Sequence, residues 1–414
     1  MPLFDVIGLG GEKVSVIIDI GEAYTKCGFA SDVSPRHIIP SSVIRNINGK
    51  IFEERISPNS VTNTTENSLY GTLRDFIQNL YFRYLLVNPK ERRVVLCESV
   101  LWPTTFRETL ARVLFYHFEV PSVLFAPSHL MSLFTLGIST ALVLECGYSE
   151  TSVLPIYEGI PMINSIEFIP LGGKTIHERL KSQLMEKGLV HIGTGIKPLS
   201  SIQDDLPPKV LEDIKVRACF VGPKINVPLN ETRPPSMVHS VDYPLDGGKL
   251  LRVEGQIREQ TYDVLFEGDG EGKSIASILL DAIMNSPIDA RKPLAENIVL
   301  IGGTSMAHGF KHRLLQELHS KLQSLKYQKK LCIQTLKLHE PPVKANCVAW
   351  LGSSIFGSLE VLADRSVSRL DYIREPSLPD WCSLSSRTNE NDDIVANEQK
   401  PAISKKFNFG SPKK

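Results

Sequence analysis

The sequence predicts an α/β protein that is built from two related lobes. Strands and helices alternate along most of the chain. An apolar strand that ends in an acidic residue, followed two residues later by glycine, occurs twice, at positions 19–21 and 145–147. A third apolar strand, 297–301, runs into a Gly-Gly turn. The repeated acid-X-Gly hairpin is a short internal repeat, and it suggests two lobes of the same design.

Composition limits the class of protein. The chain has 414 residues, of which 42% are hydrophobic and 22% charged, and its formal net charge is zero. This balance is typical of a soluble globular protein, and it gives no overall field that favours nucleic acid or an anionic membrane. Seven cysteines without a Cys-X-X-Cys pair fit reduced thiols in a cytosolic protein. We therefore expect a cytoplasmic protein without a secretory signal, a membrane-spanning segment, a nucleic-acid partner or a structural metal site.

The first lobe begins with a strand over 14–19, a tight turn and a second strand over 26–29. Residues 41–68 are rich in Asn, Ser and Thr without a sustained period, so we expect a surface excursion there. A helix is predicted from Thr72, because apolar side chains recur on one helical face. Those side chains are Leu73, Phe76, Ile77, Leu80, Tyr81, Tyr84 and Leu85.

The rest of the first lobe alternates strand and helix. Residues 93–97 form a candidate buried strand, and 122–125 form another. Between them, Thr105 and Glu108 have the spacing of a capping box, which predicts a helix start. The helix so begun would turn Leu110, Val113, Leu114 and His117 inward.

The second lobe repeats the opening pattern with strands over 141–145 and 151–157. From about 177 to 259 we expect helices, including one with Leu211, Ile214, Lys215 and Cys219 on one face, and then an irregular stretch. Later helices are predicted from the apolar spacing over 275–283, 310–322 and 348–359. We predict that the first lobe covers 1–139 and includes a polar tip at about 41–70. The second lobe is predicted to cover 140–384 and to include an irregular outer subdomain at about 177–261. Residues 385–414 are predicted to form a polar, disordered tail. The last helices of the second segment are expected to return to the first lobe.

The two hairpins have the chemistry of a phosphate clamp. A turn at a strand end exposes backbone N–H groups that hold phosphate oxygens, and Gly21 and Gly147 would let the backbone approach closely. The acids Asp19 and Glu145 would hold Mg²⁺ through water. The Gly302 turn would offer flat backbone to a nucleobase. Taken singly, each of these pieces is more often only a turn or a strand end.

The order of these pieces resembles the actin family. The run 19–30 resembles the first phosphate loop of that family, and 153–159 the strand after its second phosphate loop. Residues 213–215 resemble a helix of the upper outer subdomain, 302–306 the adenosine side, and 350–355 the C-terminal region. The resemblance implies a fold of two duplicated ribonuclease-H-like domains, with four subdomains around a central nucleotide cleft.

The resemblance also implies which residues would meet ATP or ADP with Mg²⁺. They are Asp19, Gly21, Glu22 and Lys26 in the first loop, Glu145 and Gly147 in the second, Lys215 on the outer helix, and Gly302, Gly303, Thr304 and Met306 on the adenosine side.

The phosphate side departs from the family in charge and size. Glu22 stands where the family has a serine, and a carboxylate about 4 Å from a phosphate charge costs on the order of 4 kcal/mol. Lys26 or Mg²⁺ would offset part of that cost. The second loop carries Tyr148 and Glu150 where the family has small residues.

The positions that would align an attacking water also depart from the family. They hold Ser152 instead of a histidine and, near Ser128, no glutamine. Val216 replaces a ribose-binding glutamate, and the neighbouring His129 is more simply explained as a structural residue. Hydrolysis needs an aligned attacking water. We therefore expect no catalytic residues, and nucleotide held without efficient hydrolysis.

Two further departures concern assembly. The polar stretch 47–67 does not match the tip loop with which actin engages the next subunit. The segment 267–273 is acidic and glycine-rich where actin has an apolar plug loop. Such a segment does not supply apolar contacts between strands of a filament. Alone it is explained as a solvated loop, but both changes together suggest a subunit that ends a filament.

Within the family, the resemblance is nearest to the divergent actin-related proteins of the pointed-end complex of dynactin. It is carried by 86–95, 118–131, 241–247 and 379–384. It implies a structural subunit that caps the pointed end of the actin-related filament. Its partners would be the other pointed-end subunits and the terminal filament subunits, with dynein reached indirectly in transport along microtubules.

Two other functions remain open from the residues. One is an active ATPase or small-molecule kinase of the wider fold class, which the two replaced water-aligning positions oppose. The other is a nuclear actin-related subunit of a chromatin remodeller, for which the only basic cluster is the short Lys405-Lys406 pair.

Overall fold

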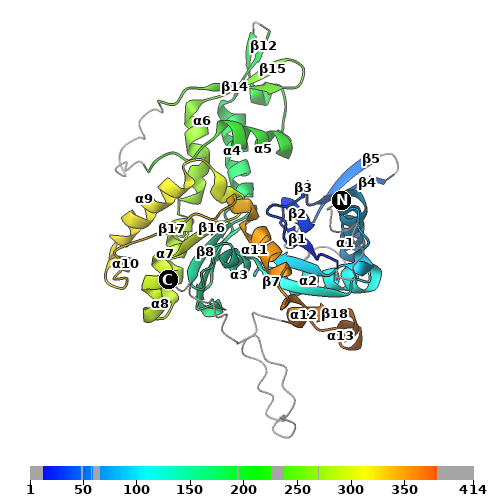
Figure 1. Ribbon diagram of the computed structural model, residues 1–414. Coiled ribbons are helices and arrows are strands. Elements are labelled where there is room, and N and C mark those ends of the chain that lie inside the picture. Colours follow the sequence, from blue (N-terminus) through cyan, green and yellow to red (C-terminus); the bar gives the residue numbers. More distant parts are fainter. Residues whose placement is uncertain are drawn as a thin grey trace. The chain divides into compact units, whose positions relative to one another are not determined.

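The computed structural model describes residues 13–47, 50–56, 58, 66–193, 195–224, 237–268 and 270–379. The chain divides into two compact units (Figure 1). The first contains the described residues of Met1–Ser139, Glu158–Ile160 and Pro341–Lys414, and the second those of Thr140–Tyr157 and Pro161–Glu340. No helix among the described residues is long and apolar enough to cross a membrane.

The first unit is built on a six-stranded sheet in the order β18-β7-β6-β1-β2-β3. Its strands are β1 (Val16–Ile20), β2 (Tyr24–Phe29), β3 (His37–Pro40), β6 (Val94–Glu98), β7 (Ser122–Pro127) and β18 (Val367–Ser368). Strands β1, β6 and β7 are parallel, whereas β2, β3 and β18 join the sheet antiparallel. The predicted strands of the first lobe are thus the centre of this sheet.

Strand β1 is buried on both faces because its side chains alternate between two hydrophobic clusters. Val16 and Ile18 belong to the cluster that contains the apolar residues of α1 and α2. Ile17 belongs to the other cluster, together with Met131 of α3 and Trp350 of α11. The helices of this unit are α1 (Glu66–Asn79), α2 (Thr104–Arg112), α3 (Ser128–Phe134), α11 (Val348–Gly357), α12 (Leu362–Arg365) and α13 (Arg369–Arg374).

The second unit repeats the core arrangement of the first. Its main sheet runs β10-β9-β8-β16-β17, and β11 pairs with β9. Strand β8 pairs antiparallel with β9 and parallel with β16, as β1 does with β2 and β6. The strands are β8 (Ala141–Cys146), β9 (Thr151–Tyr157), β10 (Ile160–Pro161), β11 (Glu167–Ile169), β16 (Ile298–Ile301) and β17 (Leu338–His339).

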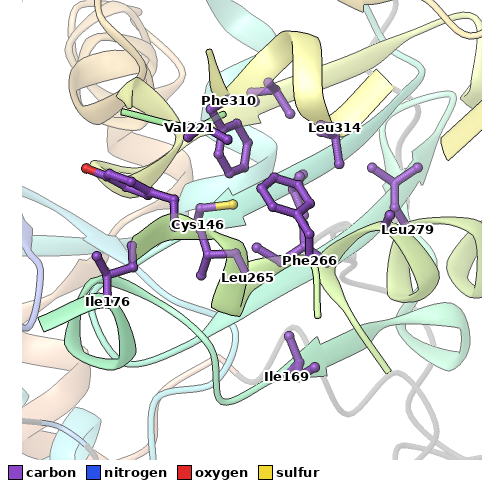
Figure 2. Packing of buried hydrophobic residues seen from close by; sticks show 14 of the residues in the cluster. Cys146, Ile169, Ile176, Val221, Leu265, Phe266, Leu279, Phe310 and Leu314 are labelled. Carbon is purple, nitrogen blue, oxygen red and sulfur yellow. The ribbon is translucent and has the colours of Figure 1, made fainter. Parts of the chain in front are cut away.

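One large hydrophobic cluster fills the second unit. Figure 2 shows Cys146, Phe266 and Phe310 close together in this cluster, and the centroids of the two phenylalanine rings are 5.7 Å apart. The predicted inward faces of α7 and α9 are confirmed, since Ile278, Leu279, Leu314 and their neighbours are buried. The helices are α4 (Gly173–Lys187), α5 (Pro208–Ala218), α6 (Gly255–Gln260), α7 (Ile275–Asn285), α8 (Ile288–Ala295), α9 (Phe310–Leu322) and α10 (Leu325–Gln328).

The prediction of an irregular outer subdomain was wrong in part, because that segment contains a four-stranded antiparallel sheet. Its order is β13-β12-β15-β14, with β12 (Leu189–Ile192), β13 (Gly195–Pro198), β14 (Val241–Leu245) and β15 (Lys249–Val253). The strands are short and include glycine and proline, which hides the period of two. Among the strand residues of this sheet, only Val190, Leu251 and Val253 are fully buried, and all three lie on one face.

The polar tip, which we expect to be a surface excursion, contains two strands that the sequence did not indicate. Strands β4 (Ser42–Ile47) and β5 (Lys50–Arg55) form a hairpin. Arg45 binds it to α1, with Nη2 3.2 Å from both Thr72 Oγ1 and Asp75 Oδ2. Val43 of β4 is buried in the first unit's hydrophobic cluster and Arg45 adds ionic contacts, but one buried residue does not make a periodic signal in the sequence.

Three local predictions in the first unit need correction. Helix α1 begins at Glu66, before the predicted start at Thr72. The proposed capping box is absent, because α2 is preceded by Pro103 and Thr105 lies inside the helix. His117 is exposed rather than buried, because residues Val113–His117 form a π-helical turn that rotates the side chains out of the α-helical register.

Some predictions concern positions outside the described residues. These are Asp269 of the acidic plug segment, the middle of the tip loop, Lys405 and Lys406, and the polar tail 385–414.

Candidate functional site

The first loop joins β1 to β2 and is a tight turn that requires glycine. Gly21 N donates to Tyr24 O at 3.2 Å, and a Cβ on Gly21 would lie 2.8 Å from the same oxygen. The buried Ser41 supports the turn, since its N–H donates to Ala23 O at 3.1 Å and its hydroxyl donates to Gly21 O. The residue that follows β3 therefore helps to fix the loop.

Lys26 and Asp19 hold each other in this loop. They face each other across the β1–β2 pair, with Lys26 Nζ 2.7 Å from Asp19 Oδ2. Burial disfavours the charged ammonium, but the charge and hydrogen bond of Asp19 outweigh it, so the pKa of Lys26 is raised. The lysine is therefore a cation that already has a carboxylate partner.

The second loop joins β8 to β9 and has the same backbone frame. Gly147 N donates to Glu150 O at 2.9 Å, and a Cβ on Gly147 would lie 3.1 Å from that oxygen. Together with the matching strand pairings, this repeats the first loop in the second unit. The sequence repeat at 19–21 and 145–147 is thus also a repeat of structure.

The carbonyl groups of the second loop lie against the first turn of α4. Gly173 N donates to Gly147 O at 3.1 Å, and Lys174 N donates to Tyr148 O at 2.7 Å. Gly172 must be glycine, because a Cβ there would lie 2.5 Å from Tyr148 O. Donors that begin a helix commonly lack partners inside the helix, and here the loop supplies them.

The Gly-Gly turn meets the second loop directly. Gly302 has φ +91°, and a Cβ on it would lie 2.2 Å from Cys146 O. Thr304 Oγ1 donates to Gly147 O at 2.7 Å. The structure therefore brings together the predicted site residues of the second loop and those of the turn. Gly303, by contrast, faces open space.

The remaining predicted residues of the second unit lie on α5 and after the turn. Lys215 is largely buried, and its Nζ lies 2.6 Å from Glu212 Oε2. Met306 ends the short 3₁₀ turn Thr304–Met306 and is half-exposed. Val216, which replaces the ribose-binding glutamate of the family, is 67% exposed.

Sequence reasoning missed two residues that connect these elements. His177 of α4 lies with Nε2 2.8 Å from Glu212 Oε2, and its ring packs edge-on against Tyr148 at 5.7 Å. The Gly172-Gly173 pair before an apolar helix was the available signal that the second loop approaches α4. No sequence pattern links His177 to Glu212.

The two positions where the family aligns water contain groups poorly suited to that task. Ser152 is buried in β9 opposite Glu145. In the first unit, His129 is fully buried, and burial lowers its pKa to about 3. An imidazole with so low a pKa is a weak base at neutral pH. His129 is therefore a structural residue rather than a replacement for the missing glutamine.

Each loop has the tight-turn backbone expected of a phosphate-binding hairpin, but its side chains do not favour a tightly held triphosphate. Glu22 and Glu150 add negative charge to the two loops, and Lys26 and Lys215 already pair with carboxylates. Over the described part of the chain, no group of three or more His, Cys, Asp or Glu side chains is placed to hold a metal ion.

Comparison with known proteins agrees with this architecture. The family model described as Actin matches residues 10–376. Actin-related protein 10 of Dictyostelium discoideum is 29% identical over 437 aligned residues, and the match covers 91% of each protein. The family model covers most of the chain, which confirms the predicted actin-like, two-lobed α/β fold. The chain belongs to the actin family.

Proposed function

We propose that this chain is a non-catalytic structural subunit of dynactin that caps the pointed end of its actin-related filament. In that role it supports dynein-driven transport along microtubules. The observation that carries the proposal is the contrast between the two loops' intact backbone and their altered side chains. A fold that keeps its frame while losing its catalytic groups is suited to assembly rather than turnover.

Support for the absence of turnover comes from both units. Lys26 is bound to Asp19 at 2.7 Å, Ser152 is buried in a strand, and His129 is uncharged at neutral pH. General-base catalysis needs a group whose pKa lies near the working pH. None of these three residues offers one. ATP or ADP with Mg²⁺, where bound, would be held by the eleven predicted loop, helix and turn residues without efficient hydrolysis.

Support for an end position in a filament comes from the tip and the plug segment. The tip hairpin is fixed to α1 through Arg45, which also approaches Glu54 at 3.3 Å. In the plug segment, Glu267 pairs with Arg179 and Glu271 with Lys273, so its described charges are engaged within the chain. The charged side chains named here are thus engaged within the chain, which supports a position at the end of a filament.

The partners follow from the dynactin-like segments of the sequence. We propose the other pointed-end subunits and the terminal actin-related subunits of the filament as direct partners, dynein as an indirect one, and the cytoplasm as the location. The likeness to an actin-related protein supports a place in this group. The division into 1–139, 140–384 and a tail at 385–414 belongs to the same proposal.

Purification of a tagged copy from cell lysate tests the proposal. Dynactin subunits should be recovered in fixed ratio, and their absence would refute the assignment. Denaturing the purified chain would release any nucleotide, and intact ATP in stoichiometric amount would support binding without turnover. An ATPase rate close to that of actin, abolished by Asp19→Asn, would instead establish an active enzyme.

A further inference from the structure

A continuous chain of side chains connects the second loop to both α4 and α5. The Tyr148 ring packs against the His177 ring, with the ring centroids 5.7 Å apart and the ring planes at 70° to each other. His177 Nε2 lies 2.8 Å from Glu212 Oε2, and Lys215 Nζ lies 2.6 Å from the same oxygen. We call Tyr148, His177, Glu212 and Lys215 the loop latch.

Glu212 is the junction of the loop latch, and its ionised form is strongly favoured. Burial opposes its charge, but the hydrogen bond with His177 and the charge of Lys215 outweigh burial and lower the pKa of Glu212 to about 2. The side chains of His177, Lys215 and Glu212 are 9%, 11% and 30% exposed, so water screens these contacts only in part. Glu212 therefore stays ionised across the physiological pH range.

Backbone contacts reinforce the side chains of the loop latch. Gly147 O and Tyr148 O accept hydrogen bonds from the first two N–H groups of α4, and the Tyr148 ring covers Gly173, with Cδ2 3.1 Å from where a Cβ would be. Both the main chain and the side chain of Tyr148 are thus fixed to the same helix. The loop is held without any group from outside the chain.

We propose that the loop latch replaces a bound nucleotide as the connection between the second loop and the outer helices of this unit. The inference rests on the proposed function, since it explains how the second loop keeps its structure in a chain without turnover. A ligand that binds Lys215 would have to compete with Glu212, and the contacts of Tyr148 with α4 hold the loop from within the chain. The order of the second loop is therefore independent of nucleotide.

Hydrogen exchange of the full-length chain tests this proposal. Mass spectrometry would follow the peptides that cover the second loop. Without nucleotide, the wild-type loop should be protected, and addition of ATP with Mg²⁺ should change its exchange less than about twofold. Glu212→Gln removes the charge at the junction while keeping its shape. It should speed exchange of the loop by about tenfold or more. Glu186→Gln changes an exposed carboxylate near the end of α4, outside the loop latch, and should behave as the wild type.

Tyr148→Ala provides a second variant that buries no charge, in case Glu212→Gln does not fold. It should also speed exchange of the loop, and by more than Glu186→Gln does. Protection of the wild-type loop that appears only with ATP and Mg²⁺ would overturn the proposal. Equal exchange in Glu212→Gln, Tyr148→Ala and Glu186→Gln would overturn it too. Recovery of dynactin subunits with the tagged chain is a separate result, so failure of the latch and failure of the proposed function can be told apart.

Discussion

Alanine at Gly302 should destabilise the second unit far more than alanine at the next residue. Gly302 has φ +91°, and a Cβ there would lie 2.2 Å from Cys146 O, whereas Gly303 has φ −70° and nothing within 4 Å of its Cβ position. Ordinary C···O contacts are about 3.3 Å, so the strand β8 backbone would have to move by about 1 Å. The two positions form a matched pair on one turn.

The size of the effect follows from two contributions. A positive φ in a residue with a Cβ costs about 1–3 kcal/mol, and overpacking costs about 1–3 kcal/mol more. We therefore expect Gly302→Ala to lower the free energy of unfolding by about 3 kcal/mol. Gly303→Ala keeps a helical φ and should leave stability unchanged or raise it by about 0.5 kcal/mol.

Urea unfolding followed by far-UV circular dichroism measures both variants. With a slope of about 3 kcal/mol/M, Gly302→Ala should lower the midpoint by about 1 M. Hydrogen exchange of peptides that cover β8 and β16 should show that the loss lies in the second unit. Midpoints for the two variants within about 0.2 M of each other would refute the argument, because the close approach to Cys146 would then carry no energetic cost.

Three further perturbations test other parts of the structure. Tyr148→Gly combined with Glu150→Val should raise the affinity for a fluorescent ATP analogue by about tenfold or more, since it removes a bulky ring and a negative charge; unchanged binding would mean that the second loop does not face phosphate. Because burial lowers the pKa of His129 to about 3, the unfolded chain binds a proton below about pH 6.5 that the folded chain does not. The free energy of unfolding should therefore fall by up to about 1.4 kcal/mol per pH unit between about pH 6 and pH 4.5, and His129→Gln, measured by urea titration at each pH, should remove that slope. Arg45→Ala should speed proteolysis within the tip hairpin while costing less than about 1 kcal/mol of global stability, because its ion pairs are partly exposed; unchanged cleavage would show that the hairpin is held by other contacts.

The sequence predicted the central strands well and the peripheral ones poorly, for a physical reason. Strands β1, β8 and β16 are buried on both faces, so their sequences are continuous apolar runs with clear ends. The tip hairpin and the outer four-stranded sheet bury one face or less. Their order comes from Arg45 and from a few residues such as Leu251, which do not produce a periodic signal.

The candidate site divides in the same way. The glycines of the two loops and of the Gly-Gly turn could be predicted, because close backbone approaches restrict those positions to glycine. The engagement of Lys26 by Asp19 follows from their opposite positions on paired strands, which a hairpin prediction nearly contains. The contact of His177 with Glu212 joins two helices through tertiary packing alone, and only coordinates reveal it.

The alternation of Val16 and Ile17 between two cores has a consequence for how this protein can change. The strand that carries the first loop is anchored twice, and neither anchor includes a side chain of the loop tip. Apart from Gly21, which the turn requires, substitutions in this loop therefore alter chemistry with little risk to folding. Evolution can remove a catalytic group from this loop, or protein engineering can add one, while the rest of the unit stays folded. The same separation makes the first loop a suitable place for engineered binding, with the folded state as a stable background.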